Sequence, residues 1–233
     1  MDPKIRKIIE NSILSSGKQK REFFLFSRIM IYIQDPLVSD EVDFQQIIDT
    51  IEKQISSHLF DGIDIIYVGQ YDELVERELE AFYESGAIYI TNTLNDNIDY
   101  IENILHENAH ALEEKDGLQI YGDQKIQNEF VGKRKRLAHN IKSAGHDIEG
   151  LDFTDPEFQQ DIDDFLYQEL GYDSLNYLIN GLFLNPYAAT SIGEYFASGF
   201  EKYLLSGSDR ERLKVFSPEL TKKIEELING NYS

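Results

Sequence analysis

The chain has 233 residues, of which 41% are hydrophobic and 12% aromatic, so it holds enough apolar side chains for a packed core. It contains no cysteine, which excludes disulfides and thiolate metal sites and leaves nitrogen and oxygen atoms as metal ligands. The formal net charge of −21 argues against nucleic acid as a partner, because so negative a surface repels phosphate backbones.

No segment reaches the ~20 apolar residues that cross a bilayer. The N-terminus, "MDPKIRKIIENSILSSG", lacks the continuous apolar stretch of a signal peptide. We therefore expect no membrane partner and a cytoplasmic location, with delivery by an unusual route left open. Two basic runs, "KQKR" at 18–21 and "KRKR" at 133–136, are interpreted as solvated surface rather than as binding patches.

Hydrophobic periodicity predicts helices and strands alternating through the first half of the chain. The predicted helices are 2–15, 42–58 and 71–84, and the predicted strands are 22–34 (with a bend), 62–69 and 86–92. A longer helix follows, with Asn95 or Asp96 as its cap, an apolar stripe from Ile98 to Leu112, and Gly117 suited to end it. The second half reads as mostly helical, with helices at 125–141, 159–170, 173–184, 191–207 and 217–228 and an acidic loop at 145–158.

The long helix carries the sequence "HENAH" at 106–110. Residues i and i+4 share one helix face, so His106 and His110 can present two imidazoles to one ion. Zinc takes neutral imidazole nitrogens and, in catalytic sites, three protein ligands and a water. Glu107 is placed to act as general base on that water and then to pass the proton to a leaving amine.

The third ligand is not fixed by this motif. A metzincin would need histidine at position 116 and glycine at 113, where this chain has Asp116 and Glu113, so that class is excluded. An aspartate from the acidic stretch 147–173 is one candidate. Glu194 is the better one, because it begins a second helix with an aromatic, apolar face. Elsewhere, His58, His139 and His146 are interpreted as non-ligands, and the acids at 161–164 as a solvated helix face without a calcium loop.

"HENAH" together with "PYAATSIGEYFASGFEKYLL" resembles the gluzincins related to the anthrax lethal factor catalytic domain and to the Mlc titration factor peptidases. The pattern Y-A-x-x-x-x-x-E-[FY]-F-A begins here at Tyr187 and places Glu194 as its glutamate. The resemblance implies that Glu194 is the third zinc ligand. It also implies that the Tyr187 phenol donates to the oxyanion of the tetrahedral intermediate.

The resemblance covers about a third of the chain, roughly 86–115 and 185–228. It implies that "GAIYITN" lies where such families hold extended substrate. The final helix, "FSPELTKKIEELI", is also similar to theirs. Two features depart from the pattern: His110 and Glu194 are 84 positions apart, and position 198 is serine where thermolysin-like enzymes place an acid near the site.

These observations predict an α+β, zincin-like fold: a small twisted mixed sheet packed on the motif helix, with a mostly helical C-terminal half. Residues 1–60 are expected to form a helix–strand–helix segment of the same domain as 61–233, which would contain an enlarged helical insert at 118–184. The expected function is zinc-dependent hydrolysis of a peptide or protein substrate. Two alternatives stay open: a zincin-fold binding or regulatory protein with weak or no hydrolysis, and a structural "HENAH" without metal.

Overall fold

The computed structural model describes residues 21–230, so the helix expected at 2–15 lies outside the described residues. The described chain forms two compact units. The first contains the described residues up to 57 together with 63–104, and the second contains 58–62 together with the chain from 105 onward. The class is α+β, with a small mixed sheet in the first unit and helices throughout the second.

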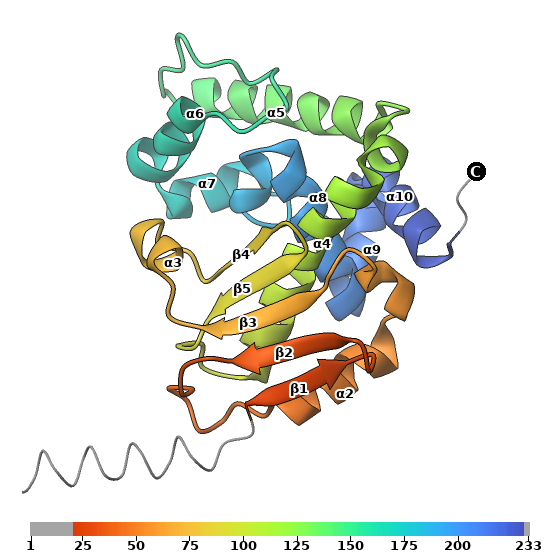
Figure 1. Ribbon diagram of the computed structural model, residues 1–233. Helices are drawn as coiled ribbons and strands as arrows, with labels where there is room; N and C mark the ends of the chain where they lie inside the picture. Colours follow the sequence, from red (N-terminus) through yellow and green to blue (C-terminus); the bar gives the residue numbers. More distant parts are fainter. Residues whose placement is uncertain (1–20, 231–233) are drawn as a thin grey trace, which may run out of the picture. The chain divides into compact units, whose positions relative to one another are not determined.

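The sheet has five strands in the order β1-β2-β3-β5-β4 (Figure 1). The strands are β1 Glu22–Leu25, β2 Ile29–Ile33, β3 Ile65–Gly69, β4 Ala81–Glu84 and β5 Ala87–Thr91. β2, β3 and β5 are parallel, and the two outer strands are antiparallel to their neighbours. Buried residues alternate with more exposed ones along β2 and β5, which is the period of two expected for strands buried mainly on one face.

The segment 22–34 forms a hairpin, so the prediction of one bent strand is wrong. β1 and β2 pair antiparallel, with Leu25 opposite Ile29. Phe26 and Ser27, in the turn, both have positive φ, 51° and 57°. Consecutive left-handed residues are the geometry of tight hairpin turns, which usually hold asparagine or glycine. Neither residue is present here, and the turn therefore gave no sequence signal.

The predicted helix at 71–84 is only partly correct. Helix α3 covers Asp72–Glu76, and the chain then reverses to form β4. Phe82 of β4 stacks on Tyr89 of β5, with ring centroids 4.7 Å apart. Strand pairing and this aromatic contact override the helical period of the segment.

β5 lies inside the sheet, with β3 on one side and β4 on the other. Its backbone is therefore paired along both edges, and no further strand can be added to it. Substrate therefore cannot add to β5 as a further strand, and the expectation that the segment 86–92 holds extended substrate stays a prediction. β4 and β1 are the edge strands of the sheet.

Two predicted helices of the first half are confirmed. Helix α2 spans Phe44–Gln54, and Asp43 caps it by accepting hydrogen bonds from two backbone N–H groups. Helix α4 spans Asn97–Tyr121 and begins in the first unit and continues in the second. Asp96 caps α4 through its Oδ1. Gly117 does not end α4; instead the helix is interrupted at Asp116, where φ is −117° and ψ is 17°.

The second unit consists of helices that follow the predicted order. Their bounds are η1 Ser57–Phe60, α5 Lys125–Ser143, α6 Gln160–Asp164, η2 Phe165–Leu170, α7 Tyr172–Leu178, η3 Tyr187–Ala189, α8 Ile192–Leu205, α9 Gly207–Phe216 and α10 Pro218–Ile228. Of these, α9 was not predicted, and η2 is a π-helix that continues α6. Among residues 21–230, no helix combines the length and apolar character needed to cross a membrane.

Candidate metal centre

The motif residues lie on α4 before its interruption at Asp116. The residues between the two histidines hold the helix in place: Ala109 is fully buried, and the Asn108 side chain donates to the carbonyl of Leu59 at 3.1 Å. His106 and His110 are one turn apart, and their ring centroids are 5.2 Å apart. "HENAH" therefore supplies the anchoring contacts of the helix as well as two imidazoles on one face.

Helix α8 supplies the carboxylate. Its cap, Ser191, accepts a hydrogen bond from the backbone N–H of Glu194 at 3.1 Å. Serine followed three residues later by glutamate is the pattern of a capping box, in which the glutamate would bond back to the cap. Here the Glu194 carboxylate lies against both histidines instead. The N-terminus of α8 also favours the ionised form of a carboxylate in its first turn.

Three side chains converge on one point. The Nε2 atom of His106 is 3.0 Å from Oε2 of Glu194, and Nε2 of His110 is 3.6 Å from Oε1. Candidate ligand atoms of these three residues all lie within 4.8 Å of one another. In the described part of the chain, this is the one group of three or more acids and histidines close enough to hold a metal ion.

The separations fit a tetrahedral ion. Ligands at ~2.0–2.1 Å from a tetrahedral zinc lie about 3.3 Å apart, and the two Nε2–Oε distances here are 3.0 and 3.6 Å. The donor set, two imidazoles and one carboxylate, suits zinc and also other first-row divalent ions such as iron(II). The residues present therefore fit zinc as three protein ligands with a fourth position for water or substrate.

A second carboxylate orients each imidazole. His110 Nδ1 lies 2.8 Å from Oε2 of Glu113, and His106 Nδ1 lies 3.3 Å from Oε2 of Glu201. Carboxylates that accept from the outer N–H of a ligating histidine fix its tautomer and raise its basicity. We call His106, His110, Glu194, Glu113 and Glu201 the histidine cluster.

The two outer carboxylates are themselves held. Glu113 accepts a short hydrogen bond from the Tyr121 hydroxyl, and Oε1 of Glu201 is 2.7 Å from Nζ of Lys202. Position 198 holds serine in place of an acid, and no sequence pattern pointed to Glu113 or Glu201 as its replacement. Glu113 had one usable signal, its position three residues after His110 on the same helix face. Glu201 lies seven residues, two helical turns, after Glu194, which places both on one face of α8.

The histidines and carboxylates of the cluster stabilise one another's ionised forms. Burial alone would lower the pKa of both histidines, but the Glu194 and Glu201 carboxylates raise the pKa of His106 to about 9. Glu113 and Glu194 raise the pKa of His110 to about 10. Burial opposes ionisation of Glu194, yet its hydrogen bonds to the two histidines lower its pKa to about 2. Glu194 is thus an anion throughout the physiological range, as a metal ligand must be.

Glu107 and Tyr187 both lie close to this cluster. Glu107 is buried, 7% exposed, and its charge helps to raise the pKa of His106 and of Tyr187. The Tyr187 ring centroid is 6.3 Å from that of His106, and the side chain is 41% exposed. Burial of the hydroxyl and the adjacent Glu194 carboxylate raise the pKa of Tyr187, so the phenol stays protonated and can donate.

The turn that carries Tyr187 is fixed by its own hydrogen bonds. The side chain of Asn185 accepts from the backbone N–H of Ala188 at 2.8 Å, and the Thr190 hydroxyl donates to the Tyr187 carbonyl at 2.8 Å. The structure therefore brings together all five residues named from the sequence: His106, Glu107, His110, Tyr187 and Glu194.

The other candidates from the sequence lie outside this group. His58 lies 3.0 Å from the carbonyl of Leu227, and His139 is exposed. The acidic stretch 147–173 contributes no member. Asp163 of this stretch is partly buried, and burial, Asp164 and Glu194 raise its pKa. It is therefore not the fully solvated residue that the sequence indicated.

A second polar cluster of the same unit surrounds Lys133, which is 5% exposed. Its Nζ donates to the carbonyl of Leu182 at 2.7 Å and to the Ser217 hydroxyl at 2.5 Å. The rings of Phe183, Tyr195 and Phe216 lie around it at 5.6, 4.7 and 5.0 Å. Burial lowers the pKa of Lys133 to about 7. We call Lys133 and these partners the lysine cluster.

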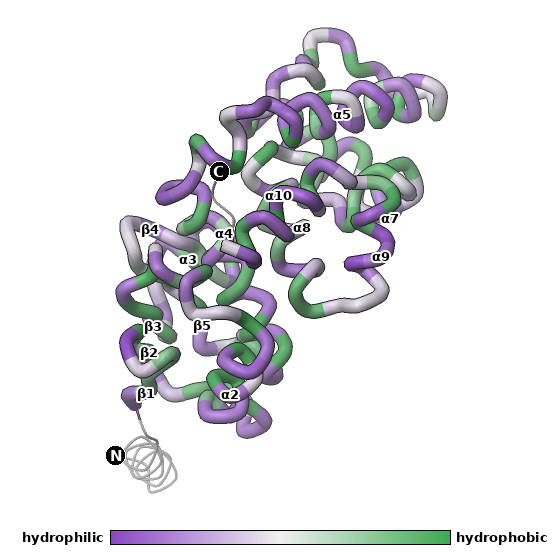
Figure 2. Tube along the Cα trace, turned by 90° about the vertical axis from the view of Figure 1, so that its right-hand side faces the viewer, coloured by the Kyte–Doolittle hydropathy of each residue, from purple (hydrophilic) through white to green (hydrophobic). Residues whose placement is uncertain are grey.

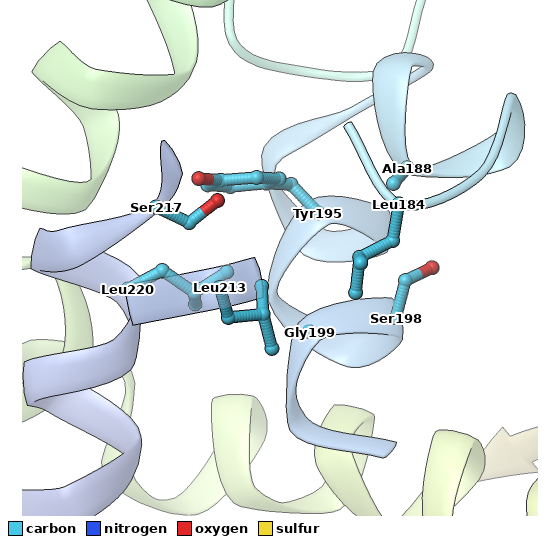
Figure 3. Close-up of a pocket in the computed structure, with 8 residues that line it drawn as sticks. All are labelled: Leu184, Ala188, Tyr195, Ser198, Gly199, Leu213, Ser217 and Leu220. Atoms are coloured by element: carbon cyan, nitrogen blue, oxygen red, sulfur yellow. The ribbon is translucent and has the colours of Figure 1, made fainter. Parts of the chain in front are cut away.

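Where α8 meets α10, the lysine cluster is closely packed. Figure 3 shows the Tyr195 and Ser217 hydroxyls close together, while Ser198 points away from them. A Cβ atom at Gly199 would lie 2.5 Å from Leu220 Cδ2, so glycine permits this close approach. Glu129 accepts from the Tyr195 hydroxyl and from the first backbone N–H groups of α10. This packing holds α8, and with it Glu194, against α10.

No model of a known protein family matches the sequence, and comparisons with curated proteins and with solved structures also give no match.

Proposed function

We propose that this protein is a zinc metallopeptidase of the gluzincin type with a zincin-like fold. The observation that carries the proposal is the convergence of His106, His110 and Glu194, each backed by a second interaction, beside a buried glutamate and an exposed phenol. The resemblance to the lethal factor and Mlc titration factor peptidases supports the same assignment.

His106, His110 and Glu194 would hold zinc, which supplies a Lewis acid that lowers the pKa of water toward neutrality and polarises a carbonyl. Glu107 accepts the proton of the attacking water at its carboxylate and delivers it to the leaving amine. Tyr187 donates its hydroxyl proton in a hydrogen bond to the oxygen that becomes negative in the transition state. Glu113 and Glu201 keep the two imidazoles oriented through their Nδ1 atoms.

Two measurements test the proposal. Metal analysis of the purified protein should give about one zinc per chain, and Glu194→Ala should lower that content strongly. A peptide library incubated with zinc-loaded protein should be cleaved, and Glu107→Gln, which keeps the three ligands, serves as the inactive control. Zinc binding without cleavage by the native protein would favour a zincin-fold binding protein, and absence of zinc would make the motif structural.

A further inference from the structure

The basic run "KRKR" at 133–136 divides into two pairs in the structure. Lys133 and Arg134 are buried, and Arg134 donates to the carbonyl of Asp155 and lies over the rings of Phe130 and Phe153. The interpretation of the whole run as solvated surface is therefore wrong for these two. Lys135 and Arg136 are exposed. Figure 2 shows hydrophilic and hydrophobic residues alternating along α5, as expected for a helix with one buried face.

The exposed pair lines a surface depression of about 390 Å³. One wall is the face of α5 that carries Lys135, Arg136, His139 and Asn140, and the other is formed by Asn180 and Leu182, just after α7. Five of these six side chains can donate hydrogen bonds, and none carries a carboxylate. Asn140 is fixed in place, because its amide donates to the carbonyl of Leu178 at 3.1 Å.

The charges of Lys135 and Arg136 are not neutralised by the described residues. Acids outnumber lysine and arginine by 43 to 22 in this chain. Lys125, Lys202, Arg212 and Lys214 each lie in an ion pair, whereas the exposed Lys53 and Lys142 form none with the described residues. Within residues 21–230, neither Lys135 nor Arg136 forms an ion pair or a side-chain hydrogen bond. Lys135 and Arg136 differ from the single unpaired lysines because they are adjacent and line the same depression, where one anion from outside the chain can meet both charges.

We propose that this depression binds the phosphate group of a small soluble molecule. The Arg136 guanidinium offers a planar fork of N–H groups that matches two phosphate oxygens, and Lys135 adds a mobile point charge. Amide donors from Asn140 and Asn180 can serve the remaining oxygens. The volume is that of a small-molecule pocket rather than of a single anion. Leu182 provides an apolar contact for the rest of the ligand.

The net charge selects a small ligand over a polymer or a lipid surface. At physiological salt, charges more than about 8 Å away are largely screened. A small anion in the depression therefore interacts mainly with Lys135 and Arg136. A nucleic acid or an anionic membrane would extend over many acidic residues of a chain with a net charge of −21 and would be repelled by them.

A neighbouring depression of about 450 Å³ fits an anion less well. Arg136 and Leu182 border it too, but Glu129 and Lys133 line it as well. The Glu129 carboxylate accepts from the N-terminus of α10, and the Lys133 amine already has two acceptors. Its lining therefore includes a negative charge and a lysine that already donates two hydrogen bonds within the protein. The anion is assigned to the depression formed by Lys135, Arg136 and His139.

The test is a titration of the native full-length protein with inorganic pyrophosphate, followed by calorimetry and by the NMR signals of the His139 ring. We expect saturable binding that shifts the His139 signals. Lys135→Ala and Arg136→Ala should each weaken binding about 10-fold, since each removes one charged donor. Arg136→Lys should also weaken binding, because it keeps the charge but removes the fork. Lys142→Ala, an equal charge change on the same helix outside the depression, should leave binding unchanged.

Two further arms separate this site from other sources of binding. Glu194→Ala removes a proposed zinc ligand, and pyrophosphate binding that persists in it cannot arise from metal coordination. Loss of binding in Glu194→Ala but not in Lys135→Ala would overturn the proposal, as would absence of saturable binding by the native protein. Binding to phosphatidylglycerol vesicles without binding to pyrophosphate would assign the two cations to a lipid surface and would also overturn it.

Discussion

The histidine cluster and the lysine cluster are both buried polar groups of the helical unit, and they differ in where their polar atoms point. In the lysine cluster the Lys133 amine donates to two separate acceptors, the carbonyl of Leu182 and the hydroxyl of Ser217. In the histidine cluster, two Nε2 atoms and a carboxylate face one another around a single point. Both clusters shift pKa values strongly, so a shifted pKa does not by itself identify a functional site.

The two clusters also differ in their expected role, which is stability for the lysine cluster and chemistry for the histidine cluster. In the lysine cluster, Lys133 is 5% exposed, lies among aromatic rings, and donates to Leu182 and Ser217 near the close contact of α8 with α10. The histidine cluster has the exposed Tyr187 beside it. Substitutions in the lysine cluster should therefore change the stability of the fold, and substitutions in the histidine cluster should change metal binding and catalysis.

The largest expected effect concerns Glu107. Glu107→Gln should lower the rate of peptide hydrolysis about 10²–10⁴-fold, because an amide cannot accept the proton of the attacking water. Zinc content and melting temperature should stay close to those of the native protein, since the change is isosteric. Native turnover in this variant, on any substrate that the native protein cleaves, would remove Glu107 from the mechanism.

The next effect concerns the phenol. Tyr187→Phe should lower kcat about 10²–10³-fold, the usual cost of removing one oxyanion donor, with little change in KM or zinc content. A core tyrosine would behave differently: loss of its hydroxyl would lower stability by about 1 kcal/mol and leave kcat unchanged. Measuring kcat and the melting temperature of the same variant distinguishes the two roles.

Substitution of the outer carboxylates, Glu113 and Glu201, should act mainly on zinc affinity. Glu113→Gln and Glu201→Gln should each weaken zinc affinity about 10–100-fold, because each removes the carboxylate that orients one imidazole. Competition with a chelator of known zinc affinity measures the change. Glu211→Gln, on the exposed part of α9, is a matched control. If both variants keep native affinity, the contacts to Nδ1 do not support the ligands.

The lysine cluster should respond in stability alone. Lys133→Met keeps most of the side-chain volume but leaves the Leu182 carbonyl and the Ser217 hydroxyl without their donor, at a cost of about 1–3 kcal/mol for a buried unpaired group. Denaturant unfolding measures the loss. Zinc affinity and kcat per folded molecule should equal the native values. A specific loss of turnover would make the lysine cluster part of the active site and end the contrast between the two.

The smallest effect is a dependence on pH. In protein kept free of metal by a chelator, the raised pKa values of His106 and His110 contribute stability. That contribution is complete below pH 6.5 and is lost as pH rises through about 9–10. The lowered pKa of Glu194 contributes stability above pH 4.5 that is lost as pH falls through about 2. Zinc needs neutral imidazoles, so its binding should release protons and strengthen as pH rises.

Thermal unfolding with and without zinc between pH 6 and 10 measures both trends. The melting temperature of the chelated protein should fall over this range, while the increment added by zinc should grow. Calorimetry in two buffers of different ionisation enthalpy counts the protons released. If zinc binding releases no protons at pH 7, the carboxylate partners do not keep the histidines protonated in the metal-free protein.

The parts of the fold that sequence predicted well are those with a strong local signal. The period of 3.6 in α2, α4, α8 and α10 and the apolar runs of β3 and β5 were read correctly. The hairpin turn at Phe26 and Ser27 and the strand β4 were not. In both cases the conformation depends on a neighbouring strand, and no residue preference within the segment records that partner.

The same division holds for the candidate site. The sequence by itself determined that His106 and His110 share a helix face with Glu107 between them, because four residues make about one helical turn. Glu194, 84 positions away, was favoured as the third ligand from its place in a second helix and then implied by the resemblance, whereas the role of Tyr187 was inferred only through the resemblance. Only the tertiary structure decided that these two residues meet that face, because packing of α8 against α10 sets where the carboxylate lies. The tertiary structure also decided that Glu113 and Glu201 contact the Nδ1 atoms of the two histidines. Other glutamates of the chain lie at similar sequence spacings, and only the direction of each side chain in the fold selects these two.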